Sequence, residues 1–198
     1  MSKQDLLKKV LSRPFSWSQF SSFRDYDKEK WYQNYVLGFK EPPNAKMMFG
    51  SKVGKCIETD PSYIPQLPRA TMEYELKATM KDIELIGFAD SYDPKKKELD
   101  EFKTGTVSIW NQKKVDNHDQ LTFYALLLYL RNEAKPEDIT IRLHHMVTEE
   151  KGDFSIGFAK PFTLTTYATK RTTKQVLMFA SEIIRLRKEM EEYILTHE

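Results

Sequence analysis

The stretch from residue 83 to residue 103 constrains the fold most strongly, because it contains two strand patterns joined by a turn signal. Apolar and β-branched residues mark 83–92 as one strand and 99–103 as the returning strand. Between them, Asp93 and Pro94 followed by three lysines are typical of a turn. The sequence therefore predicts a β-hairpin.

Three charged side chains would meet on this hairpin. Glu101 and Lys103 are two positions apart on a strand, so they point to the same face, while Phe102 points to the other. If the hairpin closes in register, Asp90 comes alongside them. Two carboxylates and an ammonium group would then suit a Mg²⁺ or Mn²⁺ ion held by carboxylate oxygens. The lysine would act as a charge or proton partner for a phosphate or an attacking water.

A solvated ion-pair network is the alternative reading of the same residues. Cross-strand ion pairs are common, and with 30% charged residues such triplets also arise by chance. Ile86, Phe88 and Phe102 nevertheless surround the acids with apolar side chains, so part of the hairpin is expected to be buried. Buried charges need partners or a metal, and this context favours the functional reading.

A second group of polar residues precedes and enters an almost unbroken apolar run at 121–130. The run contains no Gly or Pro, and it predicts a helix that is apolar nearly all round and therefore central in the core. Gln120 and Tyr124 are four positions apart and share a face of this helix. They could orient a water or a phosphate near the metal. Equally, Gln120 could be a capping-box residue and Tyr124 a core aromatic.

Four short motifs in order resemble the PD-(D/E)XK nuclease superfamily, and within it the RecB-like exonuclease branch. They are Gly-x-x-Asp at 87–90, Glu-x-Lys-Thr at 101–104, Gln-Leu-x-x-Tyr-Ala at 120–125, and an opening Ser-x-Ser-Gln-x-x-x-Phe at 16–23. The resemblance extends along nearly the whole chain, from about residue 16 to the C-terminal helix. Each motif is weak alone, but their shared order and spacing make a specific signal.

The resemblance implies a metal-dependent DNA nuclease, most simply an exonuclease acting on DNA ends in recombination, repair or phage DNA processing. Asp90 and Glu101 would bind Mg²⁺ or Mn²⁺, Lys103 would be catalytic, and Gln120 and Tyr124 would complete the site. The implied partner is DNA, with room for protein partners in a recombination, repair or phage replication complex. The implied fold is an α/β restriction-endonuclease-like core, with a central mixed β-sheet flanked by helices.

The chain departs from the family pattern before the first core strand. RecB-like nucleases usually carry Gly-x-x-x-His there, with the histidine as a metal ligand, whereas this chain has Gly54 at the histidine position. Glu58 lies one helical turn further on and could substitute as a ligand, although an exposed acid near a helix end is an equal reading. The departure supports an alternative function, a catalytically impaired DNA-binding or assembly module with a nuclease fold.

The expected organisation is one nuclease domain over 1–198, with a helical N-terminal part at 1–68 and a nuclease core at 69–198. The periodicities predict helices at 16–36, 46–58 and 172–196, the last packed on the sheet by its apolar stripe. Further strands are predicted at 72–80, 139–147 and 154–164. His144 and His145 are adjacent on a strand and face opposite sides, so they cannot share one metal.

Composition narrows the remaining possibilities. Cys56 is the single cysteine, which excludes an intramolecular disulfide and the four-cysteine iron–sulfur cluster of some RecB-like relatives. A single cysteine fits a protein of a reducing, cytoplasmic compartment. The sequence has no apolar run of membrane-spanning length, no signal-peptide pattern and no Walker motif. The formal net charge of +2 is too small to indicate nucleic-acid binding by itself.

Overall fold

A mixed β-sheet forms the centre of the molecule in the computed structural model, which describes residues 2–152 and 155–197. Within these residues six strands pair in the order β1-β2-β3-β4-β5, and β6 pairs with β4 beside β5. Their bounds are β1 Thr71–Met80, β2 Ile83–Asp93, β3 Glu98–Gly105, β4 Thr140–Glu150, β5 Ile156–Phe158 and β6 Leu164–Thr169. Only β3 and β4 are parallel, and the other pairings are antiparallel. The α/β fold class with a mixed sheet is confirmed.

The predicted hairpin is confirmed as β2 and β3. Its register pairs Ser91 with Asp100, Tyr92 with Leu99 and Asp93 with Glu98, so Asp90 and Glu101 lie next to the last paired residues. The turn forms because Oδ1 of Asp93 accepts hydrogen bonds from the backbone nitrogens that follow Pro94. The sequence pattern alone therefore determined how the two acids approach one another.

The helices occupy both ends of the chain and the β3–β4 crossover. Their bounds are α1 Lys3–Leu11, α2 Trp17–Asp25, α3 Lys28–Trp31, the π-helix η1 Tyr32–Leu37, α4 Ala45–Thr59, α5 Gln112–Asp116, α6 Asp119–Leu130, the 3-10 helix η2 Pro136–Asp138 and α7 Thr173–Thr196. The expected helices at 46–58 and 172–196 are confirmed as α4 and α7. The short amphipathic helix α1 was missed by the sequence reading.

The helix predicted over 16–36 is interrupted. Ser16 and Gln19 form the expected capping box, but the first helix ends at Asp25 and Tyr26 adopts a non-helical conformation. Asp27 then caps a new helix, because its carboxylate accepts hydrogen bonds from the backbone nitrogens of Glu29 and Lys30. An aspartate in mid-helix competes for backbone donors, and here that local competition divides one expected helix into several short ones.

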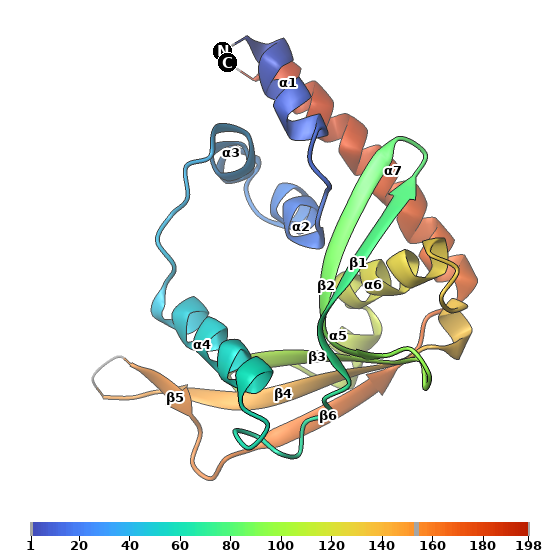
Figure 1. Ribbon diagram of the computed structural model, residues 1–198. Helices are drawn as coiled ribbons and strands as arrows, with labels where there is room; N and C mark the ends of the chain where they lie inside the picture. The colour runs from blue at the N-terminus through green and yellow to red at the C-terminus, as the bar shows by residue number, and fades with distance from the viewer. Residues whose placement is uncertain (1, 153–154, 198) are drawn as a thin grey trace.

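The main core lies between one face of the sheet and the helices α1, α2, α3, α6 and α7, which gather on one side in Figure 1. Helix α6 is central, with eight consecutive buried residues from Leu121 to Leu128. The apolar stripe of α7 is buried as predicted. However, α7 packs chiefly against α6, α1 and α2, so its expected position on the sheet is wrong. Helix α6 is apolar on nearly all sides, so one of its sides packs on the sheet and another packs against α7.

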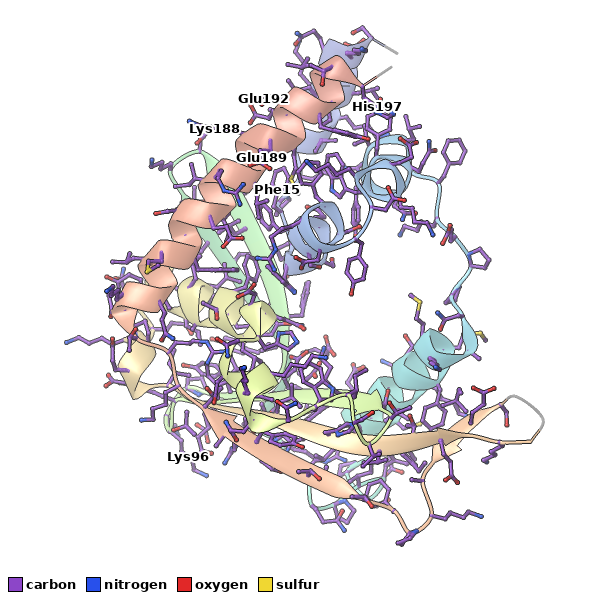
Figure 2. The ribbon with its side chains drawn as sticks, turned by 180° about the vertical axis from the view of Figure 1, so that it is seen from behind. Phe15, Lys96, Lys188, Glu189, Glu192 and His197 are labelled. Carbon is purple, nitrogen blue, oxygen red and sulfur yellow. The ribbon has the colours of Figure 1, made fainter. Side chains whose placement is uncertain are left out.

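Helix α7 also closes over the N-terminal segment. The backbone of Phe15 bridges to β2 through hydrogen bonds with Glu84 and Ile86. The Arg187 guanidinium of α7 lies 5.1 Å from the ring centroid of Phe15, and Figure 2 shows Phe15 beside this helix. Lys188 and Glu192 are exposed on the outer side of α7. The N-terminal helices are therefore tied to both the sheet and the C-terminal helix.

A smaller core covers the opposite face of the sheet. Val53 and Ile57 of α4 pack with Ile64, Leu67 and Met146. In Figure 1, α4 lies apart from the α6–α7 side, against β3 to β5. The single strand expected at 154–164 is wrong, because only residues 156–158 form β5, residues 159–163 are in no strand, and β6 begins at Leu164. Phe154, the first residue of that prediction, lies outside the described residues. No helix in the described part of the chain is long and apolar enough to cross a membrane.

Candidate active site

The five site residues predicted from sequence come together where β2, β3 and α6 meet. Asp90 is on β2, Glu101 and Lys103 are on β3, and Gln120 and Tyr124 are in the first two turns of α6. The hairpin sets the first three by register, and the β3–β4 crossover brings α6 over them. Hydrogen bonds and one ion pair link Glu101, Lys103, Gln120 and Tyr124, whereas Asp90 accepts a hydrogen bond from the backbone of Phe102.

Glu101 is the centre of the group and is 2% exposed. Its Oε1 accepts a hydrogen bond of 2.9 Å from Nε2 of Gln120 and lies 2.5 Å from Nζ of Lys103. Its other carboxylate oxygen, Oε2, is buried and has no hydrogen-bond partner in the structure. A buried carboxylate oxygen without a partner is costly, and such atoms are typical of sites that receive a water or an ion.

Asp90 lies beside Glu101 and is partly buried. Its Oδ2 accepts a hydrogen bond of 2.5 Å from the backbone nitrogen of Phe102. Burial raises the pKa of Asp90 well above its usual value, and the charge of Glu101 raises it further, although Lys103 and the Phe102 hydrogen bond oppose this. Two carboxylates held this close disfavour each other's ionised form, and a bound cation would relieve that repulsion.

Lys103 supplies the positive charge of the group, and its side chain is 29% exposed. Burial lowers the pKa of Lys103, but the charges of Glu101 and Asp90 outweigh burial, so the net pKa is raised. The side chain therefore remains an ammonium ion at neutral pH. As a cation fixed beside two carboxylates, it can contact a phosphate oxygen or a water at the same site.

Gln120 and Tyr124 form a rigid support rather than a helix cap. Gln120 donates to Glu101 and, at 2.8 Å, to the Tyr124 hydroxyl, which in turn donates at 2.8 Å to the carbonyl of Phe88. His118 provides the cap instead, because its Nδ1 accepts a hydrogen bond from the backbone of Gln120. The capping-box interpretation of Gln120 is therefore wrong, because its side chain reaches into the site.

Gly87 allows Tyr124 to approach the sheet. A Cβ atom at this position would lie 2.9 Å from Cε1 of Tyr124 and 3.0 Å from Cδ1 of Leu127. These separations are shorter than normal packing distances, so a side chain at residue 87 would push α6 away from β2. The glycine of the Gly-x-x-Asp motif thus has a packing role in this chain.

Asp100 and the two histidines have structural partners instead. Asp100 is 2% exposed, and its Oδ1 lies 2.7 Å from Nε of Arg142 and 2.8 Å from Nε2 of His144. Nε2 of His145 lies 3.1 Å from the carbonyl oxygen of Gly105, so adjacent histidines face different partners as predicted. The neighbouring acids Asp100 and Glu101 therefore differ, because both oxygens of Asp100 have partners whereas Oε2 of Glu101 has none.

Glu58 does not join the group in this structure. It is exposed on α4 and pairs with Lys55 at 2.9 Å. Gly54, four residues earlier, does line the cavity that contains Asp90 and Lys103, and a Cβ there would meet open space within 4 Å. Helix α4 thus presents a position without a side chain to this cavity. Metal ligation by Glu58 stays a prediction.

Glu73 is a further acid that the sequence reading missed. It lies on β1 and lines the same cavity as Asp90. In the sequence it is one polar residue of an amphipathic strand, and nothing in the alternation distinguishes it from Glu75. Its positive φ of 48° is a backbone feature that only the structure reveals.

Two cavities flank the group, and Lys103 lines both. One of about 490 Å³ lies toward α4 and contains Asp90. The other, of about 830 Å³, lies toward α2 and α5 and contains Gln120, Tyr124, Phe88 and Trp110. Phe88 is 45% exposed. The Trp110 ring is stacked on His118 and has the Lys114 ammonium 4.7 Å from its centroid.

The side chains fit a hard divalent cation, because carboxylate oxygens are the ligands that Mg²⁺ and Mn²⁺ prefer. Asp90 and Glu101 supply such oxygens, and Oε2 of Glu101 lacks any other partner. Among the described residues, no three His, Cys, Asp or Glu side chains are gathered in ligand geometry. Asp90 instead binds the Phe102 backbone and Glu101 binds Lys103, so coordination requires these side chains to turn.

Comparison with solved structures shows that the fold is shared with two exonucleases. A putative exonuclease from Eubacterium rectale superposes with a TM-score of 0.59 at 10% identity, covering 96% of this chain and 85% of the other. A phage-related exonuclease from Haemophilus somnus 129PT gives a TM-score of 0.55 at 11% identity, with 95% and 92% covered. No protein-family model matches the chain, and no curated protein matches it. At these identities the likeness establishes the fold.

Proposed function

We propose that this chain is a metal-dependent DNA nuclease of RecB-like type that acts as an exonuclease on DNA ends. The observation that carries the proposal is the buried Glu101 carboxylate, which has one oxygen without a partner and lies between Asp90 and Lys103. The shared fold with two exonucleases supports the same conclusion. The proposed ligand is Mg²⁺ or Mn²⁺, with the carboxylates of Asp90 and Glu101 holding it.

The bound cation would supply Lewis-acid activation of the scissile phosphate and of the attacking water. The protein would supply position and charge. Gln120 holds the Glu101 carboxylate in one orientation, and Tyr124 holds Gln120. Lys103 would stabilise the negative charge that develops on the phosphate oxygens as water attacks phosphorus, or it would assist in removing a proton from that water. Phosphoryl transfer depends mostly on such positioning and charge stabilisation.

The two cavities support a nucleic-acid substrate. A strand that crosses Lys103 would extend from the smaller cavity into the larger one, where Phe88 and Trp110 offer aromatic surfaces beside Lys114. Aromatic side chains near lysines are typical of single-stranded nucleic-acid sites, because bases stack on the rings while ammonium groups contact phosphates. This arrangement favours a single strand of nucleic acid as the substrate of the site.

The test is cleavage of end-labelled linear and circular DNA with Mg²⁺ or Mn²⁺, with and without EDTA. The native protein should degrade linear DNA from its ends and lose this activity in EDTA. Asp90→Ala, Glu101→Ala and Lys103→Ala should each abolish cleavage while circular dichroism remains native. Wild-type activity in all three variants would refute the proposed site, and rapid nicking of closed circles would refute the exonuclease mode.

A catalytically impaired DNA-binding module is the second candidate, and the open position at Gly54 favours it. Such a module would bind DNA without taking up metal. Calorimetric titration with Mn²⁺ separates the two functions. DNA binding with neither metal uptake nor cleavage would favour the module.

A further inference from the structure

The smaller cavity brings a third carboxylate to the proposed metal site. It is lined by Gly50, Val53 and Gly54 of α4 on one side. Glu73 lies on the other side with Asp90 and Lys103, although it precedes Asp90 by seventeen positions in the sequence. The cavity therefore has an open helix position facing an acid that belongs to none of the predicted motifs.

The pairing of β1 with β2 sets Glu73 opposite Asp90. Met72 pairs with Ser91 and Tyr74 pairs with Ala89, so Glu73 lies opposite Asp90 in the register of the two strands. Glu73 and Asp90 both line the smaller cavity, and they lie close enough for the charge of Glu73 to act on Asp90.

The backbone of Glu73 is in the left-handed region, with φ of 48°, in the middle of a strand. A side chain other than that of glycine is strained there, and this conformation costs roughly 1–3 kcal/mol in typical proteins. The neighbouring acid Glu75 has no such conformation and pairs with Lys77 at 3.1 Å on the surface. Strain of this kind concentrates at functional sites, where it orients a side chain.

An independent observation points to a cation at this place. Oε2 of Glu101 is buried without a partner, and the charge of Glu101 acts on Asp90 and also, after that of Glu58, on Glu73. Lys103 is the ammonium ion beside Glu101 and Asp90, and Glu58 and Lys55 of α4 act on Glu73, so the carboxylates outnumber the ammonium ions. A divalent cation would balance the remaining negative charge and give Oε2 a partner.

We propose that Glu73 is the third carboxylate ligand of the divalent cation, with Asp90 and Glu101. This inference rests on the proposed nuclease function. Glu73 is exposed, so its long side chain is free to turn inward when the cation binds. Glu58, by contrast, is held by Lys55 and does not line the cavity.

The test is calorimetric titration of the full chain with Mn²⁺ alone, in the native protein and in Glu73→Gln, Glu75→Gln and Glu58→Gln. Glu73→Gln should weaken Mn²⁺ affinity by about 10-fold or more, as loss of a metal-site carboxylate or its support does. Glu75→Gln, the matched control on the same strand, should leave affinity unchanged, and Glu58→Gln should change it by less than Glu73→Gln does.

A second variant separates ligation from folding. Glu73→Gly removes the carboxylate and suits the left-handed backbone, so it should raise the melting temperature and still lose Mn²⁺ affinity. Native Mn²⁺ affinity in Glu73→Gln and Glu73→Gly would overturn the role of Glu73 while leaving the nuclease proposal intact. Absence of both Mn²⁺ uptake and cleavage in the native protein would overturn both proposals.

Discussion

Nε2 of Gln120 donates a hydrogen bond of 2.9 Å to Oε1 of Glu101, and this bond ties helix α6 to strand β3 at the centre of the site. The same nitrogen is 2.8 Å from the hydroxyl of Tyr124. Because Glu101 is 2% exposed, no bulk water can replace this contact without opening the core. The orientation of the Glu101 carboxylate therefore depends on a residue from a different element of the fold.

Gln120→Ala should lower Mg²⁺-dependent cleavage by about 10–100-fold, because the residues that orient metal-binding carboxylates typically contribute this much. The expected cause is a misoriented Glu101, so Mn²⁺ affinity should fall together with activity. Gln112→Ala is a suitable control, since Gln112 bonds to Asp116 and Ala168 away from the site. Native metal affinity in Gln120→Ala would contradict the supporting role.

Tyr124→Phe should destabilise the protein by about 1–3 kcal/mol, because it leaves the Phe88 carbonyl and the Gln120 amide without their shared partner. The free energy of unfolding in urea measures this change. Tyr129→Phe, on the same helix, is the matched control and should have a smaller effect. Activity should fall as well, since the hydroxyl supports Gln120.

Asp90→Asn and Asp100→Asn should shift stability in opposite directions. The pKa of Asp90 is raised by burial and by Glu101, so the folded state binds its proton more tightly than the unfolded chain does. The free energy of unfolding therefore falls as the pH rises from the pKa of Asp90 in the unfolded chain, about 3.9, through its raised pKa in the folded protein. Above that pH range, the Asp90→Asn variant should have a larger free energy of unfolding than the native protein, in which Asp90 is ionised.

Asp100→Asn should instead cost about 1–3 kcal/mol, because Arg142 and His144 lose a buried charged partner. Thermal or urea unfolding at pH 8 compares the two variants directly. Asp90→Asn should be inactive but at least as stable as the native protein, and Asp100→Asn should be less stable. Equal destabilisation by both would contradict the distinction between a site acid and a structural acid.

Cleavage should decline on the acid side as pH falls through the raised pKa of Asp90, because the protonated acid no longer binds a cation. On the alkaline side Lys103 should stay charged beyond the usual range of a lysine, because the charges of Glu101 and Asp90 outweigh burial and raise its pKa. The pH profile of cleavage at limiting Mg²⁺ measures both limbs. Excess Mg²⁺ should move the acid limb to lower pH, since the cation competes with the proton.

Phe88→Ala and Trp110→Ala should each weaken binding of single-stranded DNA by about 1–3 kcal/mol if a base stacks on the ring. Both residues line the larger cavity beside Lys103. Phe39 is 67% exposed and does not line this cavity, so Phe39→Ala is the matched control. Fluorescence anisotropy of a labelled oligonucleotide in EDTA measures binding without cleavage. If both variants bind the oligonucleotide as tightly as the native protein does, the larger cavity is excluded as the path of the DNA strand.

The sequence determined the local parts of the fold and site. Alternation and turn residues fixed the β2–β3 hairpin, whose last pair, Ser91 and Asp100, lies directly next to Asp90 and Glu101. The apolar run at 121–130 identified the central helix, because only a buried helix tolerates apolar residues on all sides. These features depend on interactions between residues close in the chain, and periodicity records such interactions directly.

Tertiary structure alone decided which distant elements meet. Glu73 and Glu75 look alike in the sequence, yet strand pairing and one left-handed residue bring only Glu73 into the cavity with Asp90. Likewise, α7 packs on α6 rather than on the sheet, because α6 already occupies that face. Such contacts depend on which surface remains uncovered after other elements pack, and no local pattern encodes that competition.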